Sequence, residues 1–185
     1  MAVEARIGIG HNGGPPLEVT WSAWLWRRAH AAAWKTPPRE VAMLRIRRAE
    51  RLGLSYRDYT AVLMDRGVHM EAIVFAPGCF DPARPAVEVR EKLAALGDCR
   101  VLVCLAKPGP IDLAVRERAE AVAPVVEPKA LPAAIADFMR QIKRSPALGF
   151  MVGSEIWHER AAEEAGLSLF KPARDYFGAA VRQPR

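Results

Sequence analysis

The side chains best suited to chemistry lie near the end of the chain, in the segment Gly-Ser-Glu-Ile-Trp-His at residues 153–158. An apolar run precedes it and an alanine-rich stretch follows, which predicts a buried strand, a turn and a helix. Glu155 and His158 are three residues apart, so they would share a helix face and could act as acid and base or bind a metal ion. Because no third ligand is identifiable, we predict no metal site and expect His158 to be a capping or solvated residue. Ser154 and Glu155 are candidates for ligand binding.

Three further side chains follow predicted strands and are candidates for the same site. Asp81 lies in the segment Gly-Cys-Phe-Asp-Pro, and Lys107 and Lys129 lie in Ala-Lys-Pro and Pro-Lys-Ala. A carboxylate can serve as a nucleophile or a base, and a lysine can bind phosphate. Asp81, Lys129 and His158 are therefore the candidates for catalysis, and Lys107 and Lys129 are candidates for ligand binding.

The elements that must position these residues alternate between strand and helix from residue 68 onward. Apolar runs such as Cys-Arg-Val-Leu-Val-Cys-Leu-Ala alternate with segments whose apolar residues recur at helical spacing. This pattern predicts an α/β fold, a doubly wound, Rossmann-like parallel sheet with helices on both faces and an N-terminal helical annex. Ligands of such folds bind at the carboxyl ends of the strands. We expect a flexible tail rich in Gly and Pro at 1–19, a basic, Trp-rich helical region at 20–67 and the α/β domain at 68–185.

The predicted boundaries within these regions follow from turn and capping residues. Thr36 and two prolines begin a helix that ends at Gly53, and Ser55 caps a second helix that ends at Gly67. Asp112 is expected to cap a helix over residues 113–122, and the next strand is expected at residues 123–128.

The basic character of the chain is concentrated in the helical region. The net charge is +6, and residues 21–67 alone contain ten basic and four acidic side chains. The two helices joined by Gly-Leu-Ser resemble a helix-turn-helix, and their arginines could contact phosphates. Candidate nucleic-acid contacts are Arg45, Arg47, Arg48, Arg51 and Arg57. A run of charges on a helix is also typical of a face that is simply solvated. The basic helical region could also contact a protein partner instead of a nucleic acid.

Composition limits the remaining possibilities. The chain has 185 residues, 51% of them hydrophobic, which is enough for one sizeable core. Its three cysteines form no Cys-x-x-Cys pair, so neither a disulfide framework nor a zinc site is indicated. No apolar run is long enough to span a bilayer, and the first residues lack the pattern of a secretion signal, so we expect a cytoplasmic protein.

The strand ends, in this order and at this spacing, resemble the haloacid dehalogenase (HAD) superfamily of phosphohydrolases over residues 72–178. The best match is "MVGSEIWHERAAEEAGLSLFKPARDYFG", which looks like the last motif of the family with its helix and following strand. "EPKALPAAIADFM" looks like the segment that contains the family's lysine, at Lys129. This resemblance implies a Rossmann-like fold and an Mg²⁺-dependent phosphoryl-transfer site.

The chain departs from the HAD pattern at its acids. The position of the nucleophile falls on Ala76, that of the general acid/base on Gly78 and that of the second-motif hydroxyl on Leu105. The metal-binding acids of the last motif fall on Ser154 and His158. Phosphoryl transfer of this type needs a carboxylate nucleophile and carboxylates for Mg²⁺, so the resemblance implies a domain without that activity.

A second resemblance covers a shorter span. Residues 78–98 are similar to the opening of cytidylyltransferase-like nucleotidyltransferases, with Gly78, Phe80 and Asp81 matching Gly-x-Phe-Asp. The histidines of that family are missing, since "RPAV" stands in their place.

The sequence therefore favours a non-catalytic, HAD-like binding or regulatory protein that contacts a protein partner through its basic helical region. Two alternatives stay open. One is a nucleic-acid-binding regulator that acts through residues 36–67. The other is an atypical phosphohydrolase or nucleotidyltransferase. No cofactor is expected unless the chain is an enzyme, in which case Mg²⁺ would be required.

Overall fold

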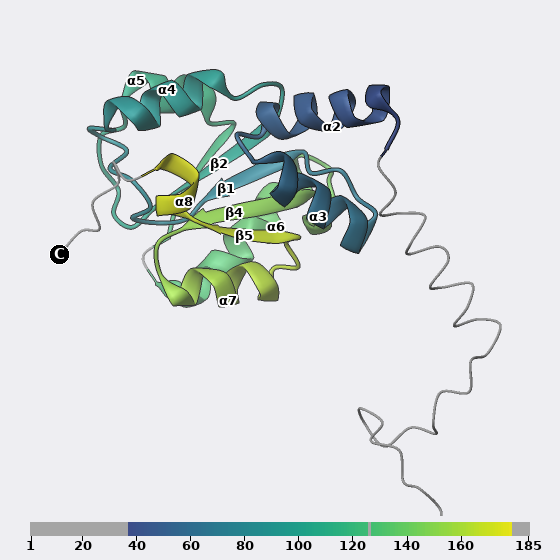
Figure 1. Ribbon diagram of the computed structural model, residues 1–185. Helices are drawn as coiled ribbons and strands as arrows, with labels where there is room; N and C mark the ends of the chain where they lie inside the picture. Colours follow the sequence, from purple (N-terminus) through teal and green to yellow (C-terminus); the bar gives the residue numbers. More distant parts are fainter. Residues whose placement is uncertain (1–36, 126, 179–185) are drawn as a thin grey trace, which may run out of the picture. The chain divides into compact units, whose positions relative to one another are not determined.

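The computed structural model describes residues 37–125 and 127–178 (Figure 1). The predicted tail at 1–19 and the Trp-rich segment at 21–35 lie outside the described residues. The strands are β1 (Ala72–Phe75), β2 (Arg100–Leu105), β3 (Ala121–Pro124), β4 (Gly149–Gly153) and β5 (Leu169–Pro172). The helices are α2 (Arg39–Arg51), α3 (Tyr56–Arg66), α4 (Val87–Ala95), α5 (Leu113–Arg118), α6 (Leu131–Gln141), α7 (Ile156–Glu164) and α8 (Ala173–Phe177). Two short 3₁₀ turns are η2 (Pro128–Ala130) and η3 (Pro146–Leu148).

The five strands form one all-parallel sheet in the order β3-β2-β1-β4-β5. Every residue of β1 and β4 is buried, which matches their uninterrupted apolar sequences. Parallel strands covered on both faces have this composition because neither face contacts water. The predicted α/β, doubly wound fold is confirmed.

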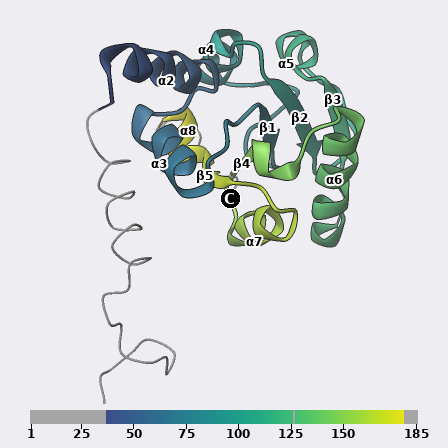
Figure 2. The same cartoon turned by 90° about the vertical axis from the view of Figure 1, so that its right-hand side faces the viewer.

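Helices cover both faces of the sheet (Figures 1 and 2), and the buried side chains form two separate clusters. Ile73 and Phe75 of β1 pack in a cluster with buried residues of α2, α3, α4, α5 and α8. Ala72 and Val74 pack in a second cluster with buried residues of α6 and α7. Adjacent residues of β1 thus belong to opposite cores, as the two-residue period of a strand requires.

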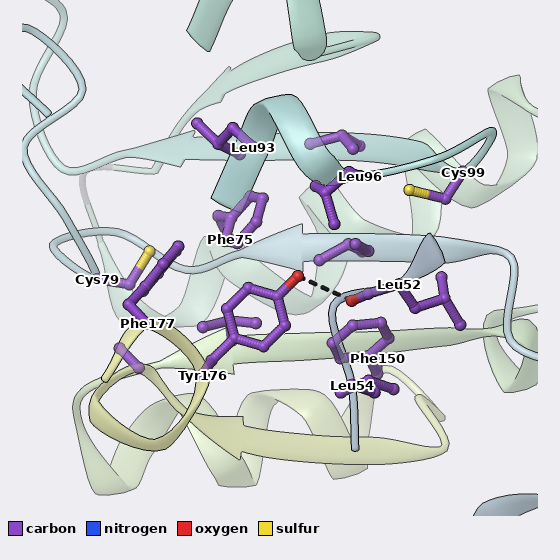
Figure 3. Close-up of a cluster of buried hydrophobic side chains, with 14 of the residues drawn as sticks. Leu52, Leu54, Phe75, Cys79, Leu93, Leu96, Cys99, Phe150, Tyr176 and Phe177 are labelled. Carbon is purple, nitrogen blue, oxygen red and sulfur yellow. Dashed lines mark hydrogen bonds between the residues drawn. The ribbon is translucent and has the colours of Figure 1, made fainter. Parts of the chain in front are cut away.

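An aromatic group forms the centre of the first core (Figure 3). The ring of Phe75 lies 5.5 Å from that of Phe80, 6.0 Å from Tyr176 and 5.7 Å from Phe177, measured between centroids. The buried Tyr176 hydroxyl donates a 2.8 Å hydrogen bond to the Leu52 carbonyl, just beyond the end of α2. This bond connects helix α8 to the chain segment between α2 and α3.

Helix α3 begins and ends at the predicted capping residues, whereas α2 ends at Arg51, two residues before the predicted Gly53. Ser55 Oγ accepts a 3.0 Å hydrogen bond from the Asp58 N–H, and Gly67 ends α3 in the left-handed conformation with φ 68°. Asp58 also accepts a 2.7 Å bond from Lys171 Nζ of β5. Buried residues of both helices belong to the same core as the sheet.

The predicted boundary between α5 and β3 is wrong. The helix was expected over 113–122 and the strand over 123–128, but α5 ends at Arg118 and β3 spans Ala121–Pro124. The Glu120 and Val125 N–H groups, which flank β3, donate to the Val101 and Leu105 carbonyls of β2. Pairing with β2 therefore outweighs the high helix propensity of the alanines.

Candidate functional site

The expected ligand position is the carboxyl edge of the sheet between β1 and β4. These strands are neighbours, yet the helices that follow them, α4 and α7, cover opposite faces. In open α/β sheets this reversal creates the crevice where ligands bind. The first residues beyond the two strands are Ala76 and Ser154.

The end of β1 offers no chemically active side chain. Ala76 is 1% exposed, and Cys79 is 2% exposed with its thiol pKa raised well above the usual range by burial. Asp81 is exposed, but its Oδ1 accepts a 2.9 Å hydrogen bond from the Ala83 N–H within its own loop. The Asp81 carboxylate therefore stabilises a turn.

The end of β4 is closed by His158. The imidazole is fully buried, and its Nδ1 accepts hydrogen bonds from the N–H groups of Ser154 and Glu155 at 3.1 and 3.0 Å. Because Nδ1 accepts, the neutral ring has its proton on Nε2, which has no hydrogen-bond partner among the described residues. Burial lowers the pKa of His158 to about 4. His158 thus caps α7, and these two N–H groups cannot bind a ligand anion while it does so.

The other predicted site residues do not come together with His158 to form a catalytic group. Glu155 is exposed at the start of α7, Lys107 is exposed after β2, and Lys129 is exposed in η2. Of these, Lys129 lies in a turn that contacts α7. Within residues 37–125 and 127–178, no three His, Cys, Asp or Glu side chains lie close enough together to hold a metal ion.

Exposed apolar side chains surround the carboxyl edge. Val87, Leu113 and Ile156 are the first residues of α4, α5 and α7, and they are 64%, 68% and 77% exposed. Helices that follow strands in a parallel sheet begin at its carboxyl edge. The carboxyl edge therefore presents these exposed apolar side chains as well as the exposed polar residues Asp81, Lys107 and Glu155.

The predicted nucleic-acid contacts differ in exposure. Arg47, Arg51 and Arg57 are exposed, whereas Arg45 and Arg48 are half-buried. Helix α3 is the second helix of the pair, which in a helix-turn-helix would be the recognition helix, but its two arginines are balanced by two aspartates. A recognition helix without net positive charge lacks the usual electrostatic attraction to the phosphate backbone.

A second polar site lies at the opposite, amino edge of the sheet. It is a cavity of about 190 Å³. Its polar lining consists of Arg48 and Arg51 of α2, His69 and Glu71 before β1, and Asp98 before β2. We call it the amino-edge cavity. His69, Glu71 and Asp98 were not among the residues predicted from the sequence, although they lie at or just before the start of a strand, because only the carboxyl ends of strands were considered.

In comparisons with known proteins, no family model, no curated protein and no solved structure matches this chain. Over the described ranges, none of the helices has the length and apolar character needed to cross a membrane.

Proposed function

We propose that this chain is a non-catalytic, HAD-like binding or regulatory protein of the cytoplasm. The observation that supports it best is found at the carboxyl edge of the sheet. There the His158 ring accepts the hydrogen bonds of the Ser154 and Glu155 N–H groups just before α7, so these groups are not free for a ligand. The HAD-type motif positions Ala76, Leu105 and Ser154 lie at the ends of β1, β2 and β4. None of them has a carboxylate or a nucleophile activated by a base, so hydrolysis by the HAD mechanism lacks its essential groups.

Helix α2 is the proposed contact surface for a protein partner. Its apolar residues Val41, Met43 and Leu44 are 38%, 43% and 49% exposed, and they precede a group of arginines in the second half of the helix that includes the exposed Arg47. Met and Arg are enriched at protein interfaces, and exposed aliphatic side chains on a basic helix suit an acidic surface with an apolar centre. The mixed character of α2 and the neutrality of α3 favour a protein over a nucleic acid.

An assay of the full chain with a generic phosphate ester and Mg²⁺ tests the absence of catalysis. We expect no turnover above the rate without protein, and no difference between the wild type and Asp81→Ala. Turnover that the Asp81→Ala variant loses would overturn the non-catalytic proposal and assign Asp81 a chemical role.

The contact surface is tested with two substitutions on α2, Leu44→Glu and Arg47→Glu, and a charge reversal on α6, Asp137→Arg, as the control. Asp137 is exposed and lies on a helix that covers the other face of the sheet. We expect a protein that associates with the wild type and the control after nuclease treatment, and with neither α2 variant. Association that nuclease abolishes, together with salt-dependent retention on DNA or RNA, would instead indicate the nucleic-acid interpretation.

A further inference from the structure

The amino-edge cavity contains a hydrogen-bonded chain that fixes one arginine in place. Arg48 Nη1 lies 2.8 Å from His69 Nε2, and His69 Nδ1 lies 2.7 Å from the Tyr59 hydroxyl. Because a guanidinium can only donate, His69 accepts at Nε2 and has its proton at Nδ1. Partial burial lowers the pKa of His69, as do the nearby charges of Arg48 and Arg45, against the opposing effect of Glu71. The ring is therefore neutral near pH 7 and uses one of the five N–H donors of Arg48.

The second arginine is held by its own hydrocarbon stem. A Cβ atom built on Gly97 would lie 2.6 Å from Arg51 Cγ and 3.0 Å from Arg51 Cβ, so the stem packs directly on the Gly97 backbone. The Gly97 N–H also donates a 2.9 Å hydrogen bond to the Arg51 carbonyl. Both arginines line one cavity, with the Arg48 guanidinium held by His69 and the Arg51 stem held by Gly97, and this partial ordering reduces the entropy cost of binding an anion.

The positive charges of Arg48 and Arg51 in the cavity remain available to a ligand. Glu71 Oε2 is 2.6 Å from Arg144 Nε, so its charge is compensated from outside the cavity lining. Among the described residues, no carboxylate lies within 4.0 Å of the guanidinium groups of Arg48 or Arg51. Asp98 is the remaining acid of the lining, and it can accept a hydrogen bond from a ligand hydroxyl.

We propose that the amino-edge cavity binds a small phosphate monoester that also contains a hydroxyl group. Arg48 and Arg51 bind the phosphate group, and Asp98 accepts the hydroxyl. The volume of about 190 Å³ fits such a ligand. It is on the order of ten times what one water molecule needs, and it is below the roughly 300 Å³ at which drug-sized pockets begin. This inference goes beyond the proposed function and does not depend on it, because the cavity is at the opposite edge from the carboxyl ends of the strands.

Calorimetric titration of the full chain with glycerol phosphate and with inorganic phosphate, in a phosphate-free buffer at constant ionic strength, tests the proposal. Three substitutions on α2 remove one positive charge each: Arg48→Gln, Arg51→Gln and, as a matched control outside the cavity lining, Arg47→Gln. We expect the dissociation constant for glycerol phosphate to rise at least about tenfold in the first two variants, since each loses charge-assisted hydrogen bonds. In the control it stays within about twofold, because a screened surface charge contributes little.

Gly97→Ala tests the cavity without changing the net charge of the protein. The new methyl group displaces the Arg51 stem, so binding weakens although both arginines are present. Asp98→Asn distinguishes the binding of the phosphate from that of the hydroxyl group. It removes a negative charge near the phosphate, and it also removes a strong acceptor for the ligand hydroxyl. We expect the preference for glycerol phosphate over inorganic phosphate to fall in this variant.

Thermal unfolding of each variant shows whether the fold is retained. Equal weakening by all three arginine substitutions would overturn the proposal, because it would indicate a general charge effect. The absence of saturable binding to the wild type up to about 10 mM would overturn it as well. Tighter binding of inorganic phosphate than of glycerol phosphate would refute the role of Asp98 and the monoester assignment.

Discussion

The buried His158 predicts a specific loss of stability in mild acid. In the unfolded chain this imidazole titrates near 6.5, whereas in the folded protein burial lowers its pKa to about 4. Between these values the unfolded state binds a proton that the folded state does not. The stabilising contribution of the neutral ring is therefore complete above pH 6.5 and is lost as the pH falls toward 4.

The magnitude follows from the two pKa values. One pKa unit corresponds to about 1.4 kcal/mol, so the full difference is about 3 kcal/mol. Ser154 and Glu155 beside the ring are partly and largely exposed. Water near them screens the charge of a protonated ring, so we expect about 2 to 3 kcal/mol between pH 7.5 and pH 4.5. This is a large share of the roughly 5 to 15 kcal/mol that holds a domain of this size folded.

The assay is urea unfolding of the wild type and His158→Gln across this pH range. His158 is the third residue of α7, and its Nδ1 accepts from the Glu155 N–H, which is the bond that a glutamine at this position makes in a capping box. Glutamine keeps the acceptor but does not titrate. The other groups are the same in both proteins, so their contributions cancel in the comparison.

We expect the wild type to lose about 2 to 3 kcal/mol more than His158→Gln on going from pH 7.5 to pH 4.5. The same pH dependence in both proteins would refute the reasoning, because it would mean that the His158 ring is not a buried acceptor. His158→Ala, which removes the acceptor and leaves a cavity, should be the least stable of the three at pH 7.5.

Two further predictions concern packing and a buried hydrogen bond. Gly153→Ala would place a Cβ atom 2.8 Å from His158 Cβ and 2.9 Å from the Phe170 ring. We therefore expect the free energy of unfolding to fall by about 1 to 3 kcal/mol. A change below about 0.5 kcal/mol would mean that α7 can move aside. Tyr176→Phe leaves the Leu52 carbonyl without its 2.8 Å bond from α8, and we expect a cost of about 1 to 2 kcal/mol by urea unfolding. An unchanged midpoint would contradict that estimate.

Most of the fold could be predicted from local patterns. Continuous apolar runs indicated strands buried on both faces, and Ser55, Gly67 and Asp112 marked helix boundaries because their capping bonds involve residues two to four positions away. The boundary at Ala121 could not be predicted in the same way. Its helix propensity is high, and only pairing with Leu102, nineteen residues earlier, makes it a strand.

The sequence by itself determined the class of fold and the absence of a carboxylate at Ala76, Leu105 and Ser154, because both depend on residue type and local order. Tertiary structure decided the rest. It placed His158 inside rather than in solvent, with its ring against the amides that a ligand would need. It also brought Arg48, His69 and Asp98, which span fifty residues of chain, to one cavity. Such distant contacts result from the packing of strands and helices, and no local pattern encodes them.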